Sequence, residues 1–179
     1  MNAKWMVLVK TALVTAAAYS AISVIQHVCP YGLVWNRTAS IPMGLYWSES
    51  VTGDQVARGD LACFSYVAPA WAKDRDYLPE GLSICKPVMG LPGDLINHEG
   101  DVLKVTSAGK DAKTVVVGQY THQDSLHRPL PQDALSNGAI PDGQLLLVSG
   151  LHANSMDSRY LGLVSKAAVS RRVHPIYTF

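Results

Sequence analysis

The sequence is poor in charged residues and lacks the local signatures of cofactor binding. Only 16% of its 179 residues are charged, and 15 basic against 14 acidic side chains leave a net charge of +1. This balance argues against a nucleic-acid partner, because proteins of that class concentrate positive charge. The sequence contains no zinc-ligand spacing, phosphate-binding glycine loop or dinucleotide fingerprint. We therefore expect neither a metal nor an organic cofactor.

Cysteine is also scarce, and the three cysteines do not form the even set that a disulfide framework requires. Cys63 and Cys85 lie in apolar, strand-like runs, and Cys29 follows a hydrophobic segment, at what would be a membrane edge. In an oxidising compartment Cys63 and Cys85 could pair, but two buried thiols fit the sequence equally well. The distance between their Cα atoms decides between the two, and that distance depends on the fold.

The long hydrophobic stretch of the chain lies at its N-terminus, where residues 11–25 carry no charge. Lys4 and Lys10 precede this run, and the next basic residue is Arg37. By the positive-inside rule, the N-terminus lies in the cytoplasm and the rest of the chain across the membrane. We predict a membrane anchor over residues 1–28. A cleaved signal peptide and a buried core helix are the alternatives.

The remaining residues, 29–179, have the composition of one mostly β domain. Scattered glycine and proline favour many short strands over long helices. One or two helical turns are expected within 70–80, and the polar stretch 97–141 is predicted to be a surface excursion with one clear strand, 113–120. Pro87 suggests an edge or an end for the strand that contains it. The predicted strands cover residues 46–47, 60–67, 82–89, 93–96, 113–120, 143–148 and 162–164.

Two residues offer nucleophilic chemistry. A serine hydroxyl needs a base to take its proton, and Ser40 stands in a short segment stiffened by Pro42. Lys86 lies in an apolar run, and burial there would lower its pKa enough for the amine to act as that base. Thr38 could share a side of the chain with Ser40, so that its hydroxyl and the Ser40 N–H form an oxyanion hole. Each of the three residues also has an ordinary structural interpretation when it is considered alone. Ser40 could be a turn residue, Lys86 could extend its amine from an edge strand to water, and Thr38 could be a solvated side chain.

A polar cluster over 154–162 supplies further candidates. Ser155 and Asp157 are two residues apart, and Arg159 could form an ion pair with Asp157 inside a polar turn. His152 offers an alternative base, in a triad with Ser40 and Asp157.

The order of these segments resembles the signal peptidase I clan of Ser–Lys proteases. The similar segments are Ser-Ile-Pro at 40–42, Gly-Asp-apolar from 59, Gly-Leu-Pro-Gly-Asp at 90–94 and Ser-Met-Asp-Ser-Arg-Tyr-Leu-Gly at 155–162. Ordinary leader peptidases place the proline three residues after the serine, carry arginine after the lysine and have Gly-Asp-Asn-Arg at the position of 149–152. The spacing found here looks more like the TraF-type branch of conjugative-transfer peptidases, which mature a pilin.

This resemblance implies a signal-peptidase-like β domain behind one transmembrane helix, at the bacterial inner membrane with its active site in the periplasm. Ser40 would be the nucleophile and Lys86 the base, with Ser155 orienting the lysine amine. Asp157 would assist, and Arg159 would support the last loop. The expected partners are a pro-pilin, the membrane and other secretion-system components, and processing could include joining of the new ends into a ring. The rival functions are a general leader peptidase and an inactive membrane-tethered scaffold of a secretion apparatus.

Overall fold

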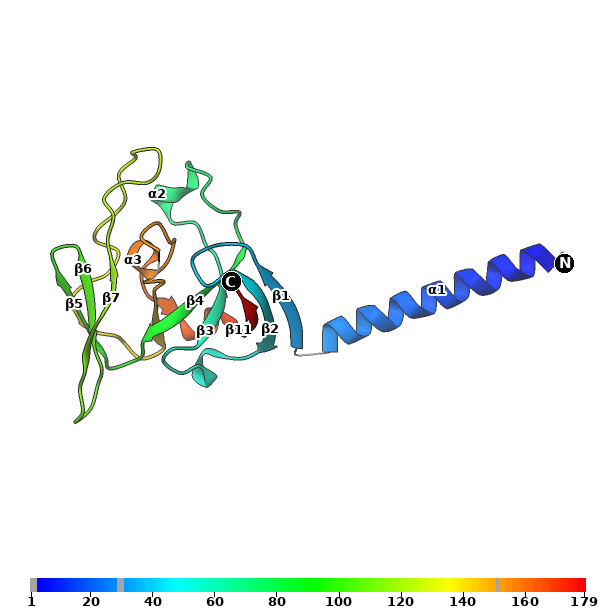
Figure 1. The fold of residues 1–179 in the computed structure, drawn as a ribbon, viewed down its shortest axis with the longest axis horizontal. Coiled ribbons are helices and arrows are strands. Elements are labelled where there is room, and N and C mark those ends of the chain that lie inside the picture. Colours follow the sequence, from blue (N-terminus) through cyan, green and yellow to red (C-terminus); the bar gives the residue numbers. More distant parts are fainter. Residues whose placement is uncertain (1–2, 29–30, 151) are drawn as a thin grey trace. The chain divides into compact units, whose positions relative to one another are not determined.

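The computed structural model describes residues 3–28, 31–150 and 152–179 (Figure 1). The chain divides into two compact units, Met1–Gly32 and Leu33–Phe179. Cys29, predicted at a membrane edge, lies outside the described residues.

The first unit contains one helix, α1, which runs over Ala3–Val28. Its alanine-rich, proline-free sequence favours this conformation over its whole length. Within the described part of the chain, no helix meets both the length and the hydropathy of a membrane-crossing segment. The predicted N-terminal helix is present as α1. Its predicted passage across a membrane is not confirmed.

The second unit is mostly β, as predicted, and is built on a seven-stranded sheet in the order β1-β2-β11-β3-β4-β9-β10. The last long strand of the chain, β11, pairs with β2 and β3, which joins the N-terminal and middle segments of the unit. The bounds of the seven strands are Tyr31–Asn36 (β1), Gly44–Ser50 (β2), Leu61–Ser65 (β3), Ser83–Gly90 (β4), Gln144–Leu147 (β9), Val164–Ser165 (β10) and Val169–Thr178 (β11).

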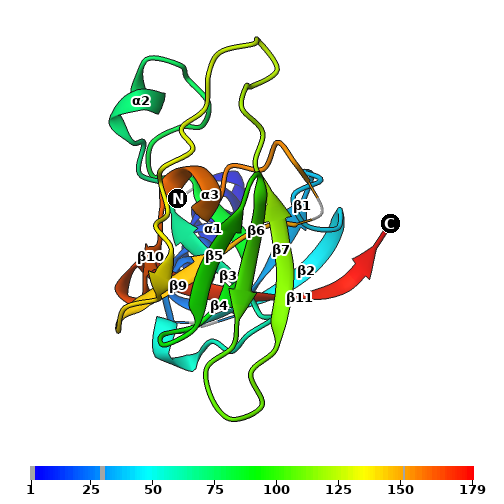
Figure 2. The ribbon, with the colours of Figure 1, turned by 90° about the vertical axis from the view of Figure 1, so that its left-hand side faces the viewer.

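A second sheet has four strands in the order β7-β6-β5-β8, and its strands β5, β6 and β7 lie side by side in Figure 2. It consists of β5 (Leu95–Glu99), β6 (Val102–Thr106), β7 (Thr114–Gln119) and β8 (Gly138–Ala139). The prediction of a surface excursion over 97–141 with one clear strand is wrong here, because the short alternating run of β6 is also a strand. Buried Leu103, Val105 and Val117 of this sheet belong to an apolar cluster that also includes Leu146 and Tyr160.

Strand β9 joins the two sheets into one unit. Leu145 and Leu147 pack into one hydrophobic cluster, whereas Leu146 packs into the cluster beneath the second sheet. All three side chains are fully buried, with 0% exposure. The uninterrupted leucine run is thus the signature of a strand covered on both faces.

Short helical turns complete the unit: η1 (Gly53–Gln55), α2 (Ala70–Lys73), α3 (Ser158–Leu161) and η2 (Lys166–Ala168). Only α2 falls where a helical turn was predicted. In α3 the carboxylate of Asp157 accepts the backbone N–H of Arg159, so a residue predicted in a polar turn caps a helix instead.

Pro87 is not at an edge of the sheet, since β4 lies between β3 and β9. It marks the place where pairing with β9 begins: its carbonyl accepts the N–H of Val148, and β9 pairs with β4 from Val88 onward. The backbone nitrogen of Pro87, which carries no hydrogen, therefore lies before the first hydrogen bond between β4 and β9, and no bond of that ladder is lost.

The cysteine alternatives are resolved by the register of β3 and β4, which sets Cys63 directly opposite Cys85. The two residues form a disulfide, with their Cα atoms 3.9 Å apart.

Candidate active site

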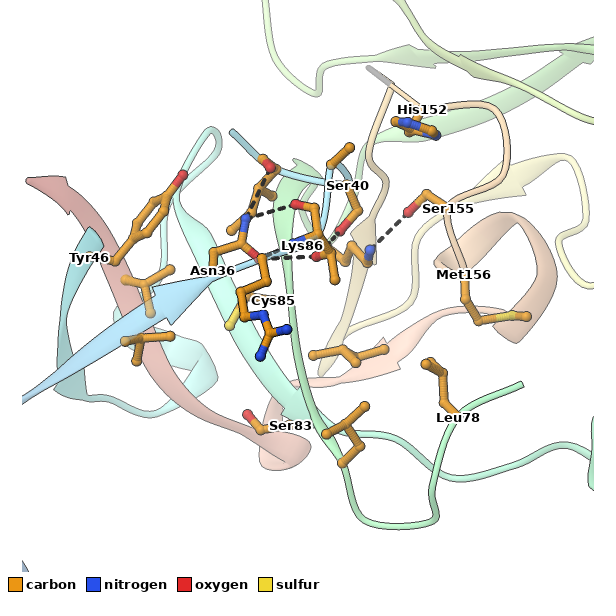
Figure 3. Close-up of a pocket in the computed structure, with 18 of the residues that line it drawn as sticks. Asn36, Ser40, Tyr46, Leu78, Ser83, Cys85, Lys86, His152, Ser155 and Met156 are labelled. Atoms are coloured by element: carbon orange, nitrogen blue, oxygen red, sulfur yellow. Dashed lines mark hydrogen bonds between the residues drawn. The ribbon is translucent and has the colours of Figure 1, made fainter. Parts of the chain in front are cut away.

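A cleft of about 590 Å³ gathers most of the predicted site residues (Figure 3). One side consists of β1 and the loop that follows it, including Thr38 and Ser40. The start of β4 with Lys86 contributes another side, and the 152–156 segment with Ser155 contributes a third. Segments more than a hundred residues apart in the sequence thus face one space.

Lys86 is buried, with 5% of its surface exposed. Its Nζ donates a hydrogen bond of 2.8 Å to the Ser155 hydroxyl (Figure 3). Burial lowers the pKa of Lys86 from its ordinary 10.5 to about 8, while the charge of Asp157 acts to raise it and that of Arg159 to lower it. Burial is the largest of these effects, so the amine is neutral in a large fraction of molecules at mildly alkaline pH.

Ser40 lies in the turn between β1 and β2, and its Oγ is 3.4 Å from the Thr38 hydroxyl. The two predicted neighbours do therefore lie on one side of the chain. The far end of this turn is shaped by Gly44, where a Cβ would lie 2.0 Å from the Tyr177 carbonyl oxygen. Only glycine allows β11 to approach so closely at this point.

Asp157 and Arg159 form a buried ion pair, with 0% and 1% side-chain exposure and 2.9 Å between Oδ2 and Nη2. Asp157 also accepts the backbone N–H of Ser149, and Arg159 donates to the carbonyl of His152. The pair therefore braces the loop that carries Ser155. Among the described residues, Asp157 does not line the cleft, so any part it has in catalysis acts through its neighbours.

The alternative triad does not form. Within the described chain the hydrogen bonds of the Asp157 carboxylate go to Ser149 and Arg159 rather than to the His152 ring. The His152 side chain lines the cleft and is exposed. Without a carboxylate to orient its imidazole, His152 lacks the arrangement that makes a triad base effective.

Two residues near the nucleophile were not predicted. The Ser149 hydroxyl donates to the carbonyl of Ser40, and the Tyr46 hydroxyl donates to the carbonyl of Pro42 at 2.6 Å. The first of these contacts joins residues 109 positions apart, which only folding brings together.

Comparisons with known proteins identify the family of this chain. The family model described as signal peptidase, peptidase S26, matches residues 3–178. The conjugal transfer protein TraF of Agrobacterium tumefaciens is 30% identical over 174 residues, covering 92% of this chain and 93% of that protein. The plasmid transfer protein TraF of Escherichia coli is 26% identical over 153 residues, covering 80% of this chain and 82% of that protein.

Among solved structures, a signal peptidase I from Enterococcus faecalis matches with a TM-score of 0.36 and 20% identity, covering 64% of this chain and 93% of that chain. The resemblance inferred from the four motif segments is confirmed, because the family match includes all of them. From the match over nearly its whole length, we conclude that this chain belongs to the signal peptidase family, peptidase S26.

Proposed function

We propose that the chain is a serine endopeptidase in which Ser40 is the nucleophile and Lys86 the general base. One observation carries the proposal: a lysine that is 5% exposed, with a pKa of about 8, lines the same cleft as Ser40. A buried, partly neutral amine that shares a cleft with a serine hydroxyl has the chemistry that nucleophilic catalysis by a Ser–Lys pair requires.

In the proposed reaction, Ser40 Oγ attacks the carbonyl carbon of the scissile peptide bond while Lys86 Nζ accepts the hydroxyl proton. Lys86 then gives this proton to the leaving amine as the C–N bond breaks, leaving an ester on Ser40. An incoming water, activated by the neutral Lys86, releases the acyl group. Ser155 orients the amine throughout, through the 2.8 Å hydrogen bond to Nζ.

The oxyanion that forms on the substrate needs hydrogen-bond donors. The Ser40 N–H has no acceptor within the described residues, so it is available for this role. In the free enzyme the Thr38 hydroxyl is 3.0 Å from Asn36 Oδ1. It would have to turn from Asn36 toward the oxyanion to become the second donor.

The cleft suits an extended peptide. Val88 N–H donates to Asp60 on the β3 side of β4. Because backbone groups alternate along an antiparallel ladder, those of Cys85 point away from β3. They point into the cleft, since pairing with β9 begins only at the Pro87 carbonyl, two residues further along β4. A substrate strand would pair there, opposite β1, with small side chains in the apolar wall formed by Ile84 and its neighbours.

We further propose that the substrate is an exported pro-pilin of a conjugative type IV secretion system. The support is similarity to proteins named for conjugal and plasmid transfer. Small residues at the cleavage site would suit the shallow cleft. A general leader peptidase is the alternative, and the proline two residues after Ser40 favours the transfer branch.

The first experiment separates an enzyme from an inactive scaffold. The full chain is treated with a serine-directed acylating probe, and the site is located by mass spectrometry. We expect one adduct, on Ser40, and none in Ser40→Ala. Failure of the wild-type chain to react, or equal labelling of Ser40→Ala, would refute the assignment of the nucleophile.

Co-expression with a candidate pro-pilin tests the substrate and the fate of the acyl group. A trimmed linear product indicates hydrolysis. A product lighter by one water indicates that the pilin's own amine attacked the ester and closed a ring. A pro-pilin left untouched while a secretory preprotein is cleaved would favour the leader peptidase.

Finally, we propose that residues 1–28 hold the catalytic unit at the periplasmic face of the inner membrane. The support is the charge pattern, with Lys4 and Lys10 before an uncharged run over 11–25. Membrane fractionation tests it: the full chain should sediment with inner membranes after an alkaline wash. Recovery of the full chain in the soluble fraction would contradict the proposal, as would a mature N-terminus beyond residue 21.

A further inference from the structure

The turn that carries Ser40 is held by side chains rather than by a strand ladder. It connects the end of β1 at Asn36 to the start of β2 at Gly44. Four of its backbone carbonyls accept side-chain hydrogen bonds: those of Thr38, Ile41 and Pro42 from Asn36, and that of Ser40 from Ser149. The Pro42 carbonyl also accepts from the Tyr46 hydroxyl, so the conformation around the nucleophile depends on three polar side chains, of which Asn36 makes the most contacts.

Asn36 makes most of these contacts. Its Nδ2 is 2.8 Å from the carbonyl oxygen of Thr38, 3.1 Å from that of Ile41 and 3.0 Å from that of Pro42. Its Oδ1 is 3.2 Å from the Thr38 backbone N and 3.0 Å from the Thr38 hydroxyl. Figure 3 shows dashed contacts that converge on Asn36 on the side of the cleft that Ser40 occupies.

The contacts also define the direction of the Thr38 hydroxyl. Three carbonyl oxygens surround Nδ2, so the amide nitrogen must be the donor on that side, and Oδ1 can only accept. The Thr38 hydroxyl hydrogen consequently points to Oδ1. Its oxygen is then left to accept from Ser40 Oγ, which lies 3.4 Å away.

We propose that Asn36 is a positioning residue that sets both the backbone of the nucleophile turn and the resting direction of the Thr38 hydroxyl. This inference rests on the proposed role of Ser40. Asn36 holds Ser40 and its N–H in the geometry for attack, and it holds the Thr38 hydroxyl by a neutral hydrogen bond. A neutral bond can be exchanged for one to the oxyanion, which is charged and binds the donor more strongly.

Asn36→Asp tests these functions without changing the size of the side chain, because aspartate has nearly the same shape as asparagine but lacks the NH₂ donor. The new carboxylate would keep an acceptor for Thr38 but would stand against three carbonyl oxygens. It would also bind the Thr38 hydroxyl more tightly than the amide does. Asn36→Asp should therefore misplace Ser40 and hold the second oxyanion donor back from the substrate. The matched control is Asn97→Asp, an exposed asparagine on β5.

The measurement is the rate of acylation of the full chain by a serine-directed probe, followed by intact mass against probe concentration and pH. We expect the limiting rate of Asn36→Asp to fall about a hundredfold, as for a reacting group misplaced by about 1 Å. The concentration for half-maximal rate should not change. The pH at which the rate rises should move upward only slightly, because Asn36→Asp adds one negative charge to the cleft that Lys86 lines but leaves the burial of Lys86 intact.

A limiting rate for Asn36→Asp equal to that of the wild type and Asn97→Asp would overturn the proposal. So would an effect on the half-maximal concentration alone. A rate loss accompanied by a shift of the pH rise all the way to the ordinary lysine value of 10.5 would also overturn it, since a shift of that size means that Lys86 is no longer buried. If Asn36→Asp does not fold, Asn36→Ser is judged by the same criteria. An error in the proposed function would appear differently, as wild-type protein that does not react at Ser40.

Discussion

Lys86→Met should make the protein more stable while abolishing its activity. Below pH 8 the folded state holds a charged lysine that is 5% exposed, and this costs stability. The fall of its pKa from 10.5 to about 8 corresponds to about 3 kcal/mol. Methionine has a similar length and no charge, so it removes this cost. The Ser155 hydroxyl loses its partner, which offsets about 1 kcal/mol. The net expected gain near neutral pH is about 2 kcal/mol.

The sign of the pH dependence follows from proton binding. Between about pH 8 and 10.5 the unfolded wild type binds a proton at Lys86 that the folded wild type has released. The free energy of unfolding of the wild type therefore rises with pH in this window relative to that of Lys86→Met. The advantage of the variant should shrink steadily and vanish as pH approaches 10.5.

Urea unfolding followed by tryptophan fluorescence, without reductant, measures this difference at several pH values from about 7 to about 10. Lys113→Met is the control, because Lys113 is exposed and its replacement should have little effect at any pH. A Lys86→Met variant less stable than the wild type at neutral pH would refute the reasoning. A difference independent of pH would refute it as well, since burial of the charge would then not be its source.

Further predictions concern the base, the buried ion pair and the disulfide. The kcat/KM for substrate cleavage should rise with pH through a group of pKa about 8, and Lys86→Arg should be inactive because arginine stays protonated; a rise near 10.5, or an active Lys86→Arg, would exclude Lys86 as base. Asp157→Asn should lower the free energy of unfolding by roughly 3–5 kcal/mol, since it leaves Arg159 charged and buried without its partner. In urea unfolding the double variant Asp157→Asn/Arg159→Met should be less destabilised than Asp157→Asn, and equal losses would contradict this. Replacing Cys63 and Cys85 together by serine should cost about 3 kcal/mol, from the loop that their disulfide closes over 22 residues; a wild-type chain with three free thiols in an alkylation assay would disprove the bond.

Local sequence was sufficient to predict the class of fold. For the site it supplied candidates, Ser40 two residues before a proline and Lys86 within an apolar run, and the order of the motif segments singled them out as the proposed nucleophile and base. Frequent glycine and proline, with short β-branched and aromatic runs, predicted a mostly β domain. The apolar run of β9 also predicted a buried strand. These properties depend on residues a few positions apart, so the sequence carries them directly.

The contacts between distant segments were decided by the tertiary structure. Ser155 reaches Lys86 across 69 residues, and Ser149 reaches the Ser40 carbonyl across 109. Such contacts depend on strand order and register, which no local pattern specifies. The same register sets Cys63 opposite Cys85 and so resolves a choice that the sequence left open.

The partner of Asp157 and the role of Asn36 were also not predictable from the sequence. Asp157 had two candidates in the sequence, His152 and Arg159, and a permanent cation two residues away on a capped helical turn outcompetes an exposed imidazole. Asn36 has the local sequence of an ordinary strand-end residue, because its importance lies in carbonyls that turn back toward it only when the chain has folded. Residue types and their spacing thus indicated the chemistry that is proposed for this protein. The long-range pairing of strands decided which side chains surround Ser40 and Lys86, because a reacting pair needs neighbours that only a folded chain can bring within hydrogen-bond distance.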